Sequence, residues 1–147
     1  MLRTLTLLVF VIHSEDDFSI FKMIEEQAKS HDIKFLLAEL APEPGLLLSD
    51  KIDRLMRESN LVLVIWSTTG QTSIWVNQEI GFVKALNKRI IPFVETGVQP
   101  KAFLVGLEWI EYNKDQPEKG IARLIDWLVK EQKKYLVTPL EPVFIFG

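Results

Sequence analysis

Apolar and polar residues change their spacing twice between Leu61 and Glu79. The run LVLVI at residues 61–65 has no alternation, so both of its faces must be buried, as in a central strand of a parallel sheet. Small polar residues at 68–72 cannot extend that strand, and Gly70 favours a sharp turn. Helical spacing then begins, with Val76, Ile80 and Val83 on one face. The segment therefore predicts a buried strand, a loop and a helix.

The remainder of the chain repeats this alternation of strands and helices. Further strands are predicted at residues 5–12, 33–40, 90–94 and 109–112, and the last helix begins at residues 117–118. Asp16 or Asp17 suits the N-cap of the first helix, and Ser49 or Asp50 that of the second. Pro92 has no backbone donor, so its strand should be short or near the sheet edge. Three tryptophans are predicted to lie in the core: Trp66, Trp109 and Trp127.

Alternating strands and helices predict an α/β fold, a flavodoxin-like doubly wound sheet of five parallel strands with helices on both faces. The expected strand order, 2-1-3-4-5, places the first and third strands side by side, and ligands bind beyond the carboxyl ends of such strands. Those ends carry the polar clusters 13–17 and 67–70. We expect both clusters to meet at one crevice with Trp75 and Glu79, within a domain spanning residues 1–136 that is followed by an apolar tail, 137–147.

Composition narrows the function classes. A chain of 147 residues with 48% hydrophobic and 25% charged residues is typical of one globular domain. The net charge of −3 gives no reason to expect a nucleic-acid partner, and the absence of cysteine excludes disulfides, thiolate metal sites and a cysteine nucleophile. Residues 5–12 are far short of the ~20 needed to span a bilayer, so we expect a cytoplasmic protein without a membrane partner. His13 and His31 lie on different predicted elements, so no metal site is expected.

Trp75 and Glu79 are the strongest candidates for a ligand site. They are four residues apart, so on a helix they project from nearly the same side, ~6 Å apart along the axis. An aromatic ring with a carboxylate one turn away, just past a buried strand, suits ligand binding. A plainer interpretation stays open, in which Asn77, Gln78 and Glu79 form a solvated face and Trp75 packs in the core. His13 could equally be a structural histidine at a strand end.

Four stretches together resemble the Toll/interleukin-1 receptor (TIR) domain family, particularly its small prokaryotic members. They are an apolar strand ending in a serine near acids (10–17), a proline-rich loop before a helix (41–52), a strand and loop followed by Ser-x-Trp-x-x-x-Glu (67–79), and a strand with a proline (89–93). The chain departs from the family at His13, where an aromatic or small residue is common, and in its tail after residue 136.

The resemblance implies two functions and does not choose between them. Many TIR domains that keep the helix glutamate cleave NAD⁺ at the nicotinamide–ribose bond, as hydrolases or cyclases, and small prokaryotic members act in immune, anti-phage signalling. NAD⁺ would then be a substrate, and no cofactor is implied. Other members are non-enzymatic interaction modules. Both kinds associate through TIR–TIR contacts, and a separate effector or sensor protein is a further expected partner.

Cleavage of NAD⁺ needs stabilisation of an oxocarbenium-like ribose, because nicotinamide leaves as a neutral molecule. Glu79 is the predicted catalytic residue, since one carboxylate near the sugar supplies opposing charge. Trp75 would stack on the nicotinamide ring. Ser14 and Ser67 would form hydrogen bonds with ribose or phosphate. Two residues complete the predicted substrate-binding set: His13 and Asp17.

A phosphorelay receiver domain shares this topology and is rejected. Such a domain needs an aspartate at the end of the third strand, where this chain has Trp66 and Ser67. The interaction module remains the serious alternative to an NAD⁺-cleaving enzyme.

Overall fold

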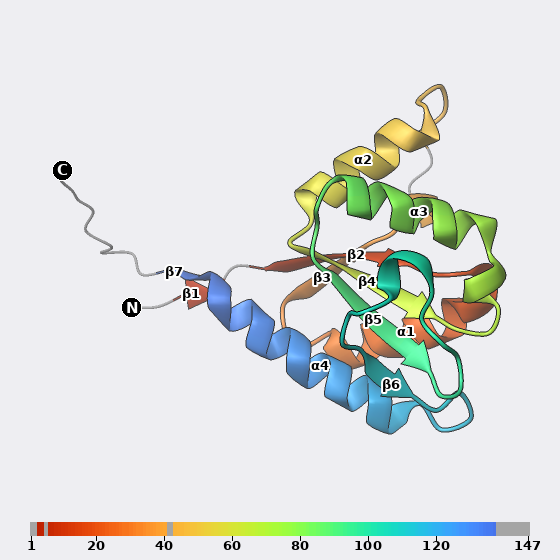
Figure 1. Ribbon diagram of the computed structural model, residues 1–147. Coiled ribbons are helices and arrows are strands. Elements are labelled where there is room, and N and C mark those ends of the chain that lie inside the picture. The colour runs from red at the N-terminus through yellow and green to blue at the C-terminus, as the bar shows by residue number, and fades with distance from the viewer. Residues whose placement is uncertain (1–2, 5, 41–42, 138–147) are drawn as a thin grey trace.

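The central element is a five-stranded parallel sheet in the order β3-β2-β4-β5-β6 (Figure 1). The computed structural model describes residues 3–4, 6–40 and 43–137. Counted along the chain, the order is the expected 2-1-3-4-5, so the predicted flavodoxin-like α/β fold is confirmed. The sheet strands are β2 (Leu7–Ile12), β3 (Ile33–Leu36), β4 (Leu61–Trp66), β5 (Ile90–Glu95) and β6 (Ile110–Tyr112). The helices are α1 (Phe18–Ala28), α2 (Leu48–Glu58), α3 (Ile74–Ala85) and α4 (Glu118–Gln132).

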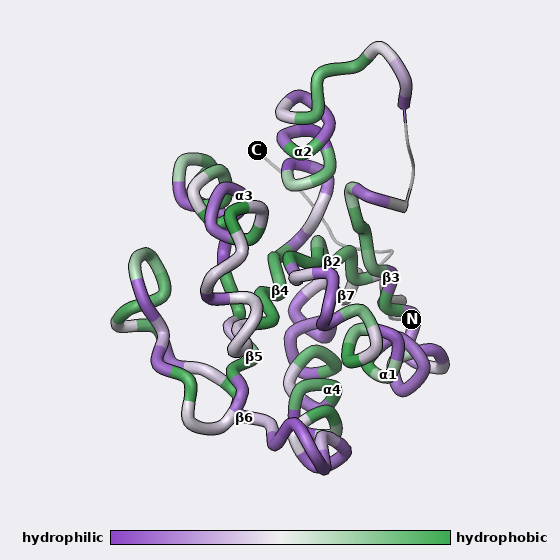
Figure 2. The backbone as a smooth tube through the Cα atoms, turned by 90° about the vertical axis from the view of Figure 1, so that its right-hand side faces the viewer, coloured by the Kyte–Doolittle hydropathy of each residue, from purple (hydrophilic) through white to green (hydrophobic). Residues whose placement is uncertain are grey.

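Two helices cover each face of the sheet (Figures 1 and 2). Every residue of β4 is buried, which confirms the interpretation of its unbroken apolar run. Alternate side chains of the strand enter two separate cores, as the period of two requires. One core lies under α1 and α4 and the other under α2 and α3. From β4 the first receives Leu61, Leu63 and Ile65, and the second receives Val62, Val64 and Trp66.

The second predicted strand, residues 33–40, is shorter than expected. Its pairing with β2 ends at Leu36 opposite Phe10, and a 3-10 turn, η2 (Ala38–Leu40), follows. The apolar pattern continues past the strand because two further residues are buried. They are Leu37, which follows the strand, and Ala38, which begins the turn. The turn places Glu39 beyond the carboxyl end of the sheet, where it becomes important for the candidate site.

Pro92 lies near the sheet edge, as predicted, because β5 is the neighbour of the edge strand β6, although at six residues β5 is not short. Pro92 lies opposite Val64 of β4, whereas pairing with β6 begins one residue later, at Phe93 and Ile110. The short partner strand therefore leaves Pro92 outside the β5–β6 ladder, which is why a residue without an N–H is tolerated there.

The predicted helix caps are also corrected. Asp17 occupies the N-cap position of α1 but makes no side-chain cap bond, because its carboxylate is engaged elsewhere. Helix α2 begins at Leu48 with Leu47 at its N-cap position, so Ser49 and Asp50 lie inside the first turn. The negative charge of Asp50 in the first turn still interacts favourably with the helix dipole.

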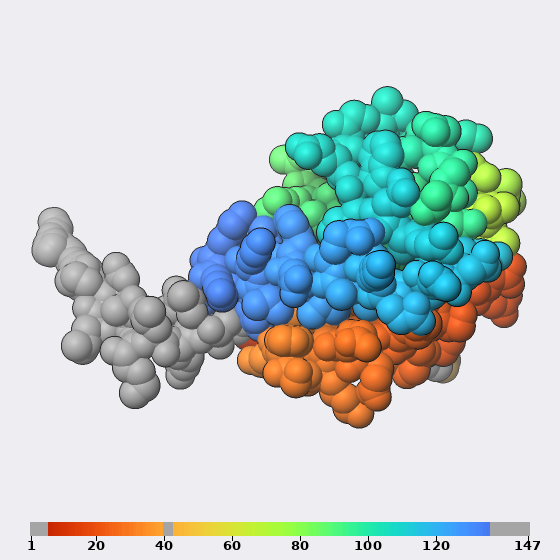
Figure 3. Space-filling view, turned by 90° about the horizontal axis from the view of Figure 1, so that it is seen from below, coloured from red at the N-terminus to blue at the C-terminus, as the bar shows by residue number. Residues whose placement is uncertain are grey.

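The contact between α4 and β6 is unusually close. A Cβ atom on Gly120 would lie 2.5 Å from the Cβ of Tyr112, so only glycine fits between helix and strand. Figure 3 shows α4 lying along this face of the molecule, beside the region of α1. Trp109, just before β6, is 45% exposed, which contradicts its predicted place in the core. Trp66 is buried, as predicted. Trp127 is partly buried against the core that lies under α1 and α4.

A second, two-stranded sheet joins the ends of the described chain. β1 (Arg3–Thr4) pairs antiparallel with β7 (Leu136–Val137). The predicted apolar tail therefore begins within β7, and its remainder, residues 138–147, lies outside the described residues. Among the described helices, none combines the length and apolar character needed to cross a membrane.

Candidate functional site

The polar clusters that follow β2 and β4 meet in a hydrogen-bonded group, which we call the serine–aspartate cluster. It consists of Ser14, Asp17, Ser67 and Thr69. The Asp17 Oδ2 atom accepts from Ser14 Oγ at 2.8 Å and from Ser67 Oγ at 2.5 Å. Thr69 Oγ1 lies 2.9 Å from Ser14 Oγ and 3.2 Å from Ser67 Oγ. Because β2 and β4 are adjacent and parallel, their carboxyl ends deliver these side chains to one place.

Gly70 completes the serine–aspartate cluster through its backbone. Its N–H donates to Ser67 Oγ at 2.9 Å. A Cβ at this position would lie 3.0 Å from the Ile65 carbonyl oxygen and 3.1 Å from Ser67 Oγ. This close approach favours glycine at the predicted turn, and the φ of Gly70 lies outside the left-handed region.

Each hydroxyl of the cluster is satisfied within the protein. The cluster therefore holds the ends of two strands together, as buried, fully bonded polar networks do. The predicted role of Ser14, Asp17 and Ser67 in binding substrate stays a prediction, since oxygen atoms of this kind can accept further bonds from a ligand.

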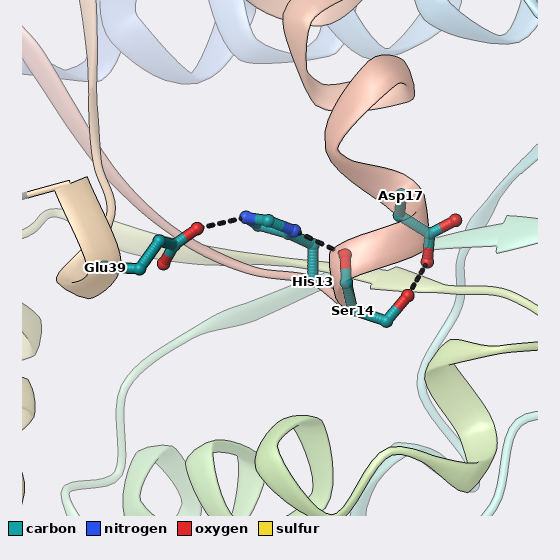
Figure 4. Close-up of polar contacts among 4 residues, drawn as sticks. All are labelled: His13, Ser14, Asp17 and Glu39. Carbon is teal, nitrogen blue, oxygen red and sulfur yellow. Dashed lines mark hydrogen bonds and ion pairs between the residues drawn. The ribbon is translucent and has the colours of Figure 1, made fainter.

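His13 lies beside the serine–aspartate cluster and is bonded on both ring nitrogens (Figure 4). Its Nε2 is 2.5 Å from Glu39 Oε2, and its Nδ1 is 2.7 Å from the Ser14 carbonyl oxygen. The imidazole also stacks on the Phe21 ring, with the centroids 6.0 Å apart. The two polar contacts and the stacked Phe21 ring hold the imidazole in a single orientation.

The contact between His13 and Glu39 favours the charged form of both. Burial alone would lower the pKa of His13, but the hydrogen bond to Glu39, the Ser14 carbonyl and the Glu39 charge raise it above 6.5. Burial alone would raise the pKa of Glu39, but the hydrogen bond and charge of His13, with the charge of Lys51, lower it below 4.5. Both changes in pKa favour the charged forms, in which the two side chains would be an ion pair.

Glu79 has the opposite surroundings. It is 1% exposed on α3, and its Oε1 atom is buried without a hydrogen-bond partner. Burial raises the pKa of the Glu79 carboxyl to about 9, and the negative charge of Glu39 adds to the rise. This rise favours the protonated form of the side chain at neutral pH. The predicted catalytic role of Glu79 stays a prediction, and the burial of this α3 side chain shows that a charged carboxylate there would need a counter-charge.

Glu79 and Trp75 share one hollow, which we call the α2–α3 hollow. Its volume is about 590 Å³, within the ordinary range for small-molecule sites. The lining is mostly apolar and comes from the start of α2 and the middle of α3: Leu48, Ser49, Ile52, Trp75, Gln78, Glu79, Gly81, Phe82 and Ala85. The spacing of Trp75 and Glu79 thus brings them to one side of α3, as predicted.

The predicted site residues fall into two neighbouring groups. Trp75 and Glu79 line the α2–α3 hollow, whereas Ser14, Asp17 and Ser67 form the serine–aspartate cluster and lie outside that lining. His13 contacts Glu39, and the negative charge of Glu39 contributes to the raised pKa of Glu79.

Two residues of the site were missed by sequence reasoning. Glu39 was placed within a strand, although a lone acid at the end of an apolar run is a usable signal for a polar side chain at a sheet end. Thr69 was expected at the crevice within the polar cluster 67–70 but was not singled out as a site residue. Within the described parts of the chain, no three or more His, Asp or Glu side chains are grouped so that they could hold a metal ion.

The family model for the TIR domain matches residues 9–125. The chain belongs to the TIR-domain family. This TIR domain also resembles solved structures at low sequence identity, which shows a shared fold. No curated protein sequence matches it significantly.

Three solved structures illustrate the shared fold. The TIR domain of the Toll-related receptor TRR-2 from Hydra magnipapillata is 15% identical, with a TM-score of 0.68 over 83% of this chain and 97% of that one. The TIR domains of the activated Roq1 resistosome, which recognises the pathogen effector XopQ, are 13% identical, with a TM-score of 0.65 over 83% and 99%. The CMP N-glycosidase BcmB of Clostridium botulinum is 15% identical, with a TM-score of 0.56 over 80% and 97%.

The chemistry open to this TIR domain is set by the state of Glu79. A buried protonated acid can donate one hydrogen bond, or it can ionise when a cation arrives and supplies the missing counter-charge. An apolar hollow strengthens either interaction, because the surrounding dielectric is low. A flat ring could lie against Trp75 on the same side of the helix.

Proposed function

We propose that this TIR domain cleaves the bond between nicotinamide and ribose in NAD⁺. The observation that carries the proposal is the buried Glu79 carboxyl, with one oxygen unbonded, beside Trp75 in the α2–α3 hollow. Buried polar atoms without partners are rare, and they concentrate at sites where function requires them. A cationic, flat ring with an attached sugar has the charge and shape that would satisfy both residues.

The proposed reaction uses the ionisation of Glu79. Nicotinamide in NAD⁺ carries a positive charge, which would lower the pKa of the nearby acid and favour its carboxylate. As the bond breaks, the bonding electrons neutralise the departing ring, and the positive charge moves to the ribose carbon. The Glu79 carboxylate would stabilise that charge. Water would then form the new bond at the same carbon and lose a proton to Glu79 or to solvent, or an internal nucleophile would form that bond instead.

Two findings support this choice of reaction. The TIR family includes proteins that hydrolyse NAD⁺, and this chain has its glutamate at the matching place in the Ser-x-Trp-x-x-x-Glu stretch. BcmB, a CMP N-glycosidase, has the same fold, so the architecture accommodates cleavage of an N-glycosidic bond in a nucleotide. The proposal includes the finer expectations of an NAD⁺ nucleosidase that self-associates through TIR–TIR contacts and acts in prokaryotic immune signalling.

The decisive experiment measures nicotinamide release by wild type and by Glu79→Gln over a range of protein concentrations. The substitution keeps the size and hydrogen-bonding capacity of the side chain but removes the charge. We expect a loss of about 10²–10³ in rate, the usual effect of removing one preorganised electrostatic group. Glu108→Gln, at an exposed position before β6, is the matched control and should retain wild-type activity.

Melting curves on all three proteins would separate lost chemistry from lost folding. Equal turnover by wild type and Glu79→Gln would refute the catalytic role of Glu79. Absence of turnover by wild type, even at high protein concentration where subunits associate, would instead favour a non-enzymatic interaction module.

A further inference from the structure

A groove opens at the amino ends of β5 and β6, and we call it the β5–β6 groove. Its volume is about 700 Å³, within the ordinary range for small-molecule sites, and among the described residues it shares none of its lining with the α2–α3 hollow. Its walls come from the end of α3 and the loop after it, from the segment before β6, and from α4. The segment before β6 and α4 lie side by side in Figure 3. Three aromatic residues and three cations give the groove its chemical character: Phe103, Trp109, Trp127, Lys84, Lys88 and Arg89.

Two of the aromatic side chains are exposed, although they are large and apolar. Phe103 is 50% exposed and Trp109 is 45% exposed. Exposed apolar surface of this kind, rimmed by polar residues, is typical of a place where a ligand or partner binds. Trp127 is partly buried against the core below the groove. The groove therefore offers aromatic faces on which a planar ring could stack.

One cation of the groove, Arg89, is held in place by two contacts. Its Nη1 donates to the Glu131 carboxylate, which is buried, and its guanidinium lies over the Trp127 ring, 4.9 Å from the centroid. A guanidinium has five N–H donors, so Arg89 can bind a further anion while it keeps the bond to Glu131. Because the two contacts already order the side chain, binding would cost little of its conformational entropy.

The lining of the groove carries a positive charge. Its three cations outnumber the one acid among the described lining residues, Glu108. Glu131 lies outside that lining and does not reverse the balance, because Lys134 also contacts its carboxylate, with Nζ and Oε2 3.0 Å apart. Arg89 and Lys134 thus share one negative charge. The groove should consequently attract an anion.

We propose that the β5–β6 groove binds a mononucleotide, with the base against the exposed aromatic rings and the phosphate among Lys84, Lys88 and Arg89. A phosphate ion alone would leave the aromatic surface uncovered, and an apolar protein segment would leave the excess positive charge unpaired. A nucleotide combines a planar base, which stacks on aromatic side chains, with a phosphate, which lysine and arginine bind. The groove has no described lining residue in common with the α2–α3 hollow, so its occupancy does not require cleavage of NAD⁺.

Isothermal titration calorimetry of the full chain with AMP is the direct test. We expect saturable binding that Trp109→Ala weakens about tenfold, an effect typical of losing one stacked aromatic contact. The double variant Lys84→Gln/Lys88→Gln should weaken binding by a similar factor, because it removes two charges of the phosphate site. Adenosine and inorganic phosphate should each bind at least about tenfold more weakly than AMP, since each lacks one of the two recognised groups. Lys101→Gln, at an exposed position outside the lining, is the matched control and should bind AMP like wild type.

Trp75→Ala separates the β5–β6 groove from the α2–α3 hollow, which would also accept a nucleotide under the proposed function. AMP binding should persist in this variant, and melting curves would show that each variant is folded. Loss of binding in Trp75→Ala, with normal binding in Trp109→Ala, would place AMP in the hollow and overturn the inference. Absence of AMP binding by wild type, or equal affinity for AMP and adenosine, would also overturn it.

Sedimentation of wild type and Trp109→Ala, with and without AMP, tests the other occupant that an apolar groove could take, a second copy of the chain. If Trp109→Ala dissociates an oligomer and AMP produces no binding heat, the groove is a protein interface and the inference fails. If wild type releases no nicotinamide from NAD⁺, the proposed function fails, while the AMP titrations still decide the role of the groove. If turnover is normal but AMP does not bind, the inference about the groove fails alone.

Discussion

The serine–aspartate cluster and the α2–α3 hollow lie close together but treat their carboxyl groups in opposite ways. In the cluster, Asp17 accepts two hydroxyl hydrogen bonds. In the hollow, Glu79 is equally buried, yet one of its oxygens has no partner. A satisfied buried carboxylate stabilises the fold, whereas an unsatisfied one lowers stability unless a ligand supplies the missing interaction. The first group is thus suited to structure and the second to binding.

The largest expected effect concerns the pH dependence of stability. Between the ordinary glutamate pKa of 4.5 and the folded pKa of about 9, folded Glu79 keeps a proton that the unfolded chain has lost. The free energy of unfolding should therefore fall as pH rises, by up to about 1.4 kcal/mol per unit, or about 3 kcal/mol between about pH 6 and pH 8. Glu79→Gln should lack this component.

Denaturant unfolding of wild type, Glu79→Gln and Glu108→Gln across this pH range would measure it. The control should follow wild type, because Glu108 is exposed. Parallel curves for wild type and Glu79→Gln would show that Glu79 is ionised at neutral pH and would remove the contrast between the two regions.

An intermediate effect is expected from Asp17→Ala, which removes the shared acceptor of the serine–aspartate cluster. Two buried serines would lose their charge-assisted bonds, so we expect a loss of about 2 kcal/mol in the free energy of unfolding. Asp16→Ala, at the exposed neighbouring position, is the matched control and should change stability little. Denaturant midpoints of equal value would argue that the cluster does not hold the strand ends together.

The smallest effect is expected from Gly70→Ala. The added methyl group would lie 3.0 Å from the Ile65 carbonyl oxygen and 3.1 Å from Ser67 Oγ, closer than van der Waals contact, so we expect a loss of about 1 kcal/mol. Gly81→Ala, where a Cβ meets nothing within 4 Å, should stabilise α3 by a similar amount. Thermal melting of both variants would show opposite shifts, and a stabilised Gly70→Ala protein would contradict the close approach at that glycine.

Much of the fold was predictable from local patterns, because an unbroken apolar run such as residues 61–65 has one stable environment, the middle of a parallel sheet. The pairing of Trp75 with Glu79 was predictable for the same reason, since helical spacing fixes it. Both conclusions depend only on residues close together in the sequence.

Other features were not predictable, because they depend on distant segments. The protonation of Glu79 results from burial beneath α2 and from the charge of Glu39, which the 3-10 turn η2 delivers. The need for Gly120 arises only where α4 meets Tyr112 on β6. The tolerance of the six-residue strand β5 for Pro92 depends on where the short partner strand β6 begins. Each is a consequence of tertiary contact rather than of local propensity.

The protonated state of Glu79 also has a consequence for ligand choice. An uncharged acid in an apolar hollow distinguishes ligands by their charge more than by their outline. Oxidised nicotinamide dinucleotide has a cationic ring, and the reduced form has a neutral ring of nearly the same size. Only the cationic ring of the oxidised form would offset the free-energy cost of ionising Glu79. Under the proposed function, the affinity of the hollow would consequently depend on the redox state of the dinucleotide.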